Sequence, residues 1–301
     1  MSTCLGGWIY RPDEVARWVG DPLNKSPVFS ASAYKLRGTG AGKEAYLYRK
    51  IIKAVGSFKI RTQRIGNCVS KSWSSATDNI DILNRLRLGL PQQKARIAAA
   101  PYYGFSRYEV GWLENRARLR GDGSVGAWAA RAAIKYGCLR QQRYGQYDLT
   151  TDDDDTLSKK WGDSGVPNEI EPKAREILVQ HAALVTSWED VADAVCNEKI
   201  VIVSCDIGFS RKMDKYGFIR RGAPWGHSWY IIAVRNHGPR PGALLANSWD
   251  ENWAEGTLPE DEPPGCAWIH PEDVHDCVRI QQDSYAIASV TGLDEDPWVM
   301  V

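Results

Sequence analysis

Cys68, His227 and Asn247 are the residues of this chain whose types and order could carry out acyl transfer. A cysteine thiolate can attack a carbonyl carbon, an imidazole can hold the thiol proton, and an amide can orient the imidazole. Cys68 lies in the segment QRIGNCVSKSW, His227 begins the run HSWYIIAV, and Asn247 lies in ANSW. A lone cysteine at a helix start is more often structural, so it is the three segments together that favour thiol chemistry.

The residues that follow Cys68 predict the helix that must position it. Apolar side chains recur at helical spacing and fall on one face: Val69, Trp73, Ala76, Ile80 and Leu83. Asn67 is the expected N-cap. Because the first turn of a helix stabilises negative charge, we expect Cys68 to have a low pKa and to be the most readily alkylated of the seven cysteines.

His227 and Asn247 are expected on neighbouring strands. Three short runs rich in β-branched and aromatic residues are bounded by Gly, Pro or Asn: 200–205, 228–234 and 243–247. Before them the pattern is helical, with helices expected after the cap Ser124, from Pro172 to about Val185, and after the capping box at Ser187. Helices in the first half and strands in the second indicate an α+β fold.

These segments resemble those of the papain-like cysteine peptidases. NSW with a second tryptophan at Trp253 is similar to that family's asparagine segment, and Gln63 upstream of Cys68 is similar to its oxyanion segment. The run GDGSVGAW at 121–128 resembles its glycine-rich turn and the start of the following helix. The resemblance covers roughly residues 58–290. It implies a two-lobed α+β fold, with a helical half, a β-rich half and a cleft between them.

The resemblance also implies roles for particular residues and a polypeptide substrate. Cys68 is the expected nucleophile, His227 the proton carrier and Asn247 the residue that fixes the imidazole tautomer. The Gln63 side chain and the backbone N–H of Cys68 are expected to hold the oxyanion. Trp249 is expected to shield the contact between His227 and Asn247 from solvent.

The termini lie outside this resemblance. We expect an N-terminal extension at residues 1–57, a papain-like domain at 58–290 and a C-terminal tail at 291–301. The extension could be a pro-segment, an interaction arm or an elaboration of the domain. Both ends are rich in apolar side chains, so we expect them to pack on partner chains or across the chain's own domain: Trp8, Tyr10, Trp18, Phe29, Tyr34, Trp298 and Val299.

Two other functions fit the same residues. Val69 stands where the family places an aromatic residue, and Gln63 lies five rather than six positions before the cysteine. These departures favour a structural or assembly protein, such as a component of a virion, that keeps the papain fold with or without activity. A cell-wall amidase that uses the same cysteine and histidine is a third candidate.

Composition excludes several other classes of protein. A net charge of +1 predicts no nucleic-acid partner, and no apolar run reaches the length of a membrane span. The N-terminus lacks a secretion signal, so we expect a cytoplasmic or virion-associated protein. Seven irregularly spaced cysteines are expected to be mostly reduced.

No cofactor or metal is expected from the sequence. GTGAGKE at 38–44 lacks the spacing of a phosphate-binding loop. The acidic run Asp152 to Asp155 lacks a calcium pattern and is interpreted as a solvated loop. Four residues near the C-terminus could be grouped as zinc ligands, but their spacing fits no common zinc site: Cys266, His270, His275 and Cys277.

Overall fold

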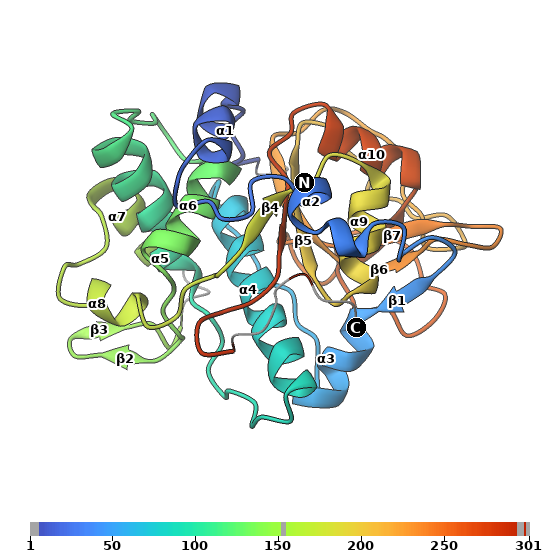
Figure 1. The fold of residues 1–301 in the computed structure, drawn as a ribbon, viewed down its shortest axis with the longest axis horizontal. Coiled ribbons are helices and arrows are strands. Elements are labelled where there is room, and N and C mark those ends of the chain that lie inside the picture. Colours follow the sequence, from blue (N-terminus) through green and yellow to red (C-terminus); the bar gives the residue numbers. More distant parts are fainter. Residues whose placement is uncertain (1–5, 152–154, 294–297, 299–301) are drawn as a thin grey trace.

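The chain forms two lobes around one central helix. The computed structural model describes residues 6–151, 155–293 and 298. Figure 1 shows most helices on one side of the molecule and the sheet on the other, with α4 (Cys68–Arg87) between them. The predicted two-lobed α+β fold is confirmed.

The N-terminal and helical parts contain α1 (Pro12–Val19), α2 (Phe29–Ser32), the 3-10 helix η1 (Tyr34–Leu36), α3 (Leu47–Val55), α4, α5 (Ala99–Gly104), the π-helix η2 (Phe105–Glu114), α6 (Gly126–Lys135), α7 (Asp155–Ser164) and α8 (Glu171–Ala174). The sheet lobe adds α9 (Trp188–Cys196) and α10 (Pro271–Arg279). Its strands are β1 (Glu44–Tyr46), β4 (Ala182–Leu184), β5 (Ile200–Cys205), β6 (His227–Arg235), β7 (Gly242–Ala246), β8 (Cys266–Ile269) and β9 (Tyr285–Ile287). A separate hairpin joins β2 (Arg143–Tyr144) and β3 (Tyr147–Asp148).

The large sheet fixes the start of strand β6. Its strands are ordered β4-β9-β5-β6-β7-β8, with β1 added beside β6. All of these pairings are antiparallel, and Cys205 at the end of β5 lies opposite His227. His227 therefore begins a strand that is bonded on both sides, and its backbone has little freedom to move.

Helix α4 follows the predicted pattern. The five apolar residues of its predicted face are at most 1% exposed, so the helix is anchored in the core along its whole length. Asn67 is its N-cap residue, but its side chain makes no capping hydrogen bond. Its side-chain nitrogen instead donates to Asp155, the first residue of α7.

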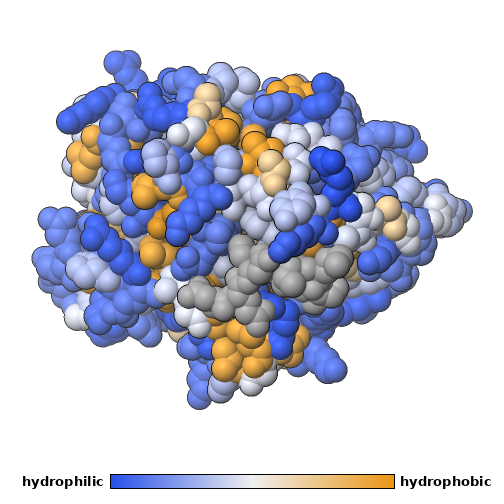
Figure 2. All heavy atoms as spheres, viewed as in Figure 1, coloured by the Kyte–Doolittle hydropathy of each residue, from blue (hydrophilic) through white to orange (hydrophobic). Residues whose placement is uncertain are grey.

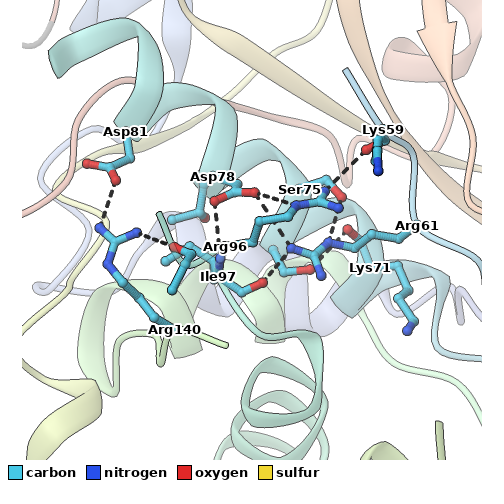
Figure 3. A network of polar contacts seen from close by, with 12 residues as sticks. Lys59, Arg61, Lys71, Ser75, Asp78, Asp81, Arg96, Ile97 and Arg140 are labelled. Carbon is cyan, nitrogen blue, oxygen red and sulfur yellow. Dashed lines mark hydrogen bonds and ion pairs between the residues drawn. The ribbon is translucent and has the colours of Figure 1, made fainter. Parts of the chain in front are cut away.

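Buried ion pairs and hydrogen bonds hold a second face of α4. Figure 3 shows arginines from three segments of the chain converging on this helix. Their bonds are Arg61 Nε to Ser75 Oγ at 3.1 Å, Arg96 Nε to Asp78 Oδ2 at 2.9 Å and Arg140 Nη2 to Asp81 Oδ2 at 2.7 Å. Because these acids are almost fully buried, the pairing prevents the cost of isolated charges in the interior. The helix is thus a rigid support for the cysteine at its start.

The two ends of the chain pack on the chain itself. Trp298 is 5% exposed, and its indole N–H donates to Ser26 Oγ at 3.1 Å. Its ring meets Phe29 edge-on at 5.3 Å. Trp8, Trp18 and Phe29 are buried as expected, whereas Tyr10 and Tyr34 are exposed, and Val299 lies outside the described residues. Packing across the chain's own domain is therefore sufficient for these anchors; the division into domains stays a prediction.

Two local predictions are wrong. The helix expected from Pro172 to Val185 ends at Ala174, and β4 follows because it pairs with β9, which is distant in sequence. Ser124 does not cap α6, whose cap residue is Val125. In contrast, the predicted cap at Ser187 is confirmed, since its hydroxyl accepts the N–H of Asp190 at 3.1 Å, while the Asp190 carboxylate accepts the N–H of Thr186.

The surface is largely hydrophilic on the face in Figure 2, where hydrophobic side chains appear in small groups. Within the described residues, no helix combines the length and the hydrophobicity that a membrane span requires.

Candidate active site

The structure brings His227 and Asn247 into direct contact at the open ends of β6 and β7. His227 Nε2 lies 2.7 Å from Asn247 Oδ1, which also accepts the backbone N–H of Ser248 at 2.7 Å. An amide oxygen can only accept, so Nε2 carries the ring proton. Nδ1 is buried and has no hydrogen-bond partner within the described part of the chain. It is thus free to accept a proton.

Tryptophan side chains enclose this histidine. The ring of Trp249 stacks on the imidazole with 4.4 Å between the centroids, in line with the predicted shielding role. Trp225, which the sequence analysis did not single out, meets the same imidazole edge-on at 5.3 Å. Its position two residues before His227 is the feature of the sequence that could have identified it as part of the site. The aromatic surroundings exclude water from the bond between His227 and Asn247.

Cys68 begins α4 beside the strand that His227 begins. Burial raises the pKa of the Cys68 thiol to about 12, although the backbone N–H groups of Ser228, Val69, Cys68 and Gly7 oppose this by stabilising the thiolate. Burial lowers the pKa of His227 to about 4, against the opposing effect of the hydrogen bond with Asn247. Both groups are therefore neutral near pH 7, and the predicted low pKa of Cys68 is wrong for this state.

Gln63 lies close to the same site through its contacts with Ser248. Its backbone N–H donates to the Ser248 carbonyl at 2.7 Å, and its side-chain oxygen accepts the Ser248 hydroxyl. Its side-chain Nε2 donates to the carbonyl of Ile65 at 3.1 Å. Gln63 is thus held at the segment before Cys68, with its amide group turned toward that segment's own backbone.

Residues 6–9, here called the strap, lie across the junction of the lobes. The N–H groups of Gly7 and Trp8 donate to the Gly226 carbonyl at 2.7 and 2.9 Å. On the other lobe, Ser124 N–H donates to the Gly7 carbonyl at 2.7 Å, and Ile9 N–H donates to the Ser124 carbonyl at 2.9 Å. The strap therefore bridges the residue before His227 and the turn before α6. The cleft expected between the lobes is closed at this point.

Gly6 and Gly7 of the strap fit closely against the backbone of Gly226 and Gly66. A Cβ atom on Gly7 would lie 2.1 Å from the carbonyl oxygen of Gly66, and a Cβ on Gly6 would lie 2.8 Å from that of Gly226. Real Cβ atoms do not approach so closely, so only glycine fits at Gly7 without displacement of the strap. This close fit explains why Cys68, His227 and Asn247 are at most 1% exposed.

Trp8 anchors the strap. Its indole N–H donates to Asp283 Oδ2 at 2.7 Å, and the same oxygen accepts the N–H of Gly126 at 2.8 Å. Burial raises the pKa of Asp283 to about 6, while these donors lower it. Asp283 thus takes the capping role that was predicted for Ser124, and it ties the strap to the first residue of α6.

The other candidate sites have local partners. His270 packs on the ring of Phe218 with 4.6 Å between centroids, and His275 Nδ1 lies 3.3 Å from the backbone nitrogen of Trp188. No group of three or more His, Cys, Asp or Glu side chains that could hold a metal ion is found in residues 6–151, 155–293 and 298.

Solved structures share this architecture. Xylellain, a cysteine protease from Xylella fastidiosa, superposes with a TM-score of 0.58 and 13% identity over 94% of this chain and 95% of that one. Procathepsin B S9 from Trypanosoma congolense gives 0.56 and 13% over 94% and 85%. The chain has the papain-like fold. The protease and lectin-like domains of Cwp84 from Clostridium difficile give 0.53 and 14% over 97% of this chain and 63% of that one.

Comparisons based on sequence alone give no match. No family model matches the chain, and no curated protein sequence matches it. At 13–14% identity the shared feature is the papain-like fold itself.

Burial changes the expected order of thiol reactivity. Among the described cysteines other than Cys68, Cys196 is partly exposed, and burial raises the pKa of its thiol to about 11. We expect limiting iodoacetamide at pH 8 to label Cys196 before Cys68 in the full chain, because Cys68 is covered and less acidic. Peptide mapping measures the order. Earlier labelling of Cys68 would show that the strap does not cover it in solution.

Proposed function

We propose that this chain is a thiol peptidase of the papain-like fold and that it hydrolyses peptide bonds in polypeptides. The observation that carries this proposal is the bond between His227 Nε2 and Asn247 Oδ1, which leaves Nδ1 as the proton acceptor. Cys68 lies next to the N–H of Ser228, which directly follows that histidine. A thiol, an acceptor nitrogen and an orienting amide are the groups that nucleophilic acyl transfer needs.

The reaction then proceeds in two steps. The thiol proton passes to Nδ1 of His227 as the sulfur attacks the peptide carbonyl carbon, and the carbonyl electrons move to oxygen. The backbone N–H of Cys68 and the amide of Gln63 stabilise that oxygen. His227 returns the proton to the leaving amine, and water hydrolyses the thioester to release the acid and regenerate the thiol.

The described state is the closed form of this peptidase. The strap covers Cys68, and both catalytic groups are neutral there, so a substrate can bind only after the strap leaves. A chain that opens rarely can still be trapped by a reagent that reacts irreversibly, because labelled molecules accumulate from the minor open state.

A peptidyl epoxide tests this proposal. We expect prolonged incubation to open the epoxide ring on the sulfur of Cys68 and to raise the mass of the peptide that contains Cys68 but not of the peptide that contains Cys138. The control is Cys138, which is equally buried and whose pKa burial also raises to about 12. Labelling of both cysteines would indicate unfolding, and absence of the label from Cys68 at long times would refute the proposed function.

A further inference from the structure

A fully buried ion pair lies one turn into α4 from Cys68. Lys71 Nζ is 2.9 Å from Asp155 Oδ1, and the two side chains are 0% and 4% exposed. Asp155 belongs to the acidic run that the sequence placed in a solvated loop, and for this residue that prediction is wrong; Asp152 to Asp154 lie outside the described residues. Asp155 is instead the first residue of α7, turned inward against α4.

The same carboxylate binds the segment between Gln63 and Cys68 at two points. Oδ2 accepts the backbone N–H of Arg64, and Oδ1 accepts the side-chain amide of Asn67 at 2.9 Å. Asp155 thus holds the Asn67 amide by its nitrogen, and the amide oxygen, the atom that would accept a capping bond, has no hydrogen-bond partner among the described residues. One side chain from α7 thus joins both ends of the segment 64–67 to the first turn of α4.

Helix stability does not account for this arrangement. A lysine in the first turn of a helix opposes the helix dipole, and burying an ion pair costs several kcal/mol of desolvation that the attraction only partly offsets. The contacts instead fix the position of the segment that precedes Cys68. The held segment runs from Gln63 to Cys68, the two residues that carry the proposed oxyanion donors.

We propose that Asp155, with Lys71, is a positioning residue that holds in place two donors for one oxyanion: the Cys68 N–H, and the N–H of the Gln63 amide other than the one that Ile65 accepts. This inference rests on the proposed function and deepens it. The carboxylate does not touch the reacting atoms. It acts through Arg64 and Asn67, and a small displacement of donors is enough to weaken oxyanion binding greatly.

Two reactions of Cys68 separate this role from a general one. A peptide aldehyde such as acetyl-phenylalanyl-glycinal adds to the sulfur: the C–S bond forms, and the carbonyl oxygen takes the electron pair and needs the oxyanion donors. Iodoacetamide alkylation displaces iodide and needs only the thiolate. Both reactions require the same opening of the strap. The ratio of aldehyde affinity to alkylation rate therefore does not depend on how often the strap opens.

The main variant is the double substitution Asp155→Asn with Lys71→Met in the full chain. It removes both charges, so neither is left buried alone. We expect aldehyde affinity to fall roughly tenfold to a hundredfold, with the pH profile of alkylation unchanged. Asn67→Ala keeps the ion pair and is expected to give a smaller loss of the same kind. Asp163→Asn, on an exposed residue of the same helix, is the matched control.

Each outcome decides the matter. If both variants bind the aldehyde as tightly as the unaltered chain does, the positioning role is overturned. It is also overturned if aldehyde affinity and alkylation rate fall together, because that is the result of a merely structural role. If the double variant does not fold, Asn67→Ala alone decides between these results. If the unaltered chain forms no adduct at Cys68 at all, the proposed function itself fails.

Discussion

Removal of the sulfur of Cys68 is expected to lower peptide hydrolysis by at least about 10,000-fold, the scale seen when a nucleophile is removed from a catalytic triad. The substitution Cys68→Ala should be made in a chain that also carries Gly7→Ala, so that the strap does not limit turnover. The loss is large because His227, Asn247 and the oxyanion donors cannot form the thioester without the sulfur. A library of fluorogenic peptides measures turnover.

Two comparisons make this result specific. Cys138→Ala removes a sulfur that is just as buried and lies in the helical lobe, and it should leave turnover unchanged. His227→Ala should cause a loss close to that of Cys68→Ala, since residues that act as a unit are not additive. Equal turnover with and without the Cys68 sulfur would show that another group is the nucleophile.

Addition of one methyl group to the strap is expected to open the site. In Gly7→Ala the new carbon would lie 2.1 Å from the Gly66 carbonyl oxygen, so the strap must move away. Overpacking of this kind costs about 1–3 kcal/mol, which corresponds to roughly a 5- to 150-fold increase in the open population. Alkylation of Cys68 by iodoacetamide should accelerate by at least this factor, because exposure also removes the burial that raises the pKa of its thiol.

The matched control is Gly20→Ala, at the end of α1. There a Cβ would lie 3.5 Å from the nearest atom, the Ala16 carbonyl oxygen, which is an ordinary contact. We expect this variant to alkylate Cys68 at the rate of the unaltered chain. If Gly7→Ala does not accelerate alkylation either, the strap does not limit access to the thiol.

Sequence reasoning predicted best where a local pattern decides the structure. The helix from Cys68 and the strands at 200–205, 228–234 and 243–247 follow from apolar periodicity, and the structure has them within one or two residues. His227 and Asn247 meet because they sit at adjacent ends of paired strands. The resemblance to papain-like peptidases predicted that contact before any geometry was known.

The features that were missed depend on contacts between distant segments. Nothing local in Gly6, Gly7 and Trp8 indicates a position over Cys68, and Asp155 is one of four acidic residues that look alike in sequence. Asp283 likewise has no neighbours that indicate a cap for α6. The protonation state of Cys68 was mistaken for the same reason, since a helix terminus lowers a thiol pKa only where water or charge can reach it.

Trp8 and Asp283 are 275 residues apart, so the ribosome releases the strap long before its anchor exists. Segments made first fold first, and contacts between distant segments form last. Until Asp283 and β9 have left the ribosome, the carboxylate that accepts the Trp8 indole N–H is missing, and the strap is not yet fully anchored over Cys68. A strap with its Trp8 anchor in place therefore belongs to chains that extend past Asp283. In nascent chains, and in chains truncated before Asp283, only the backbone bonds to Gly226 and Ser124 are left to hold the strap over this cysteine.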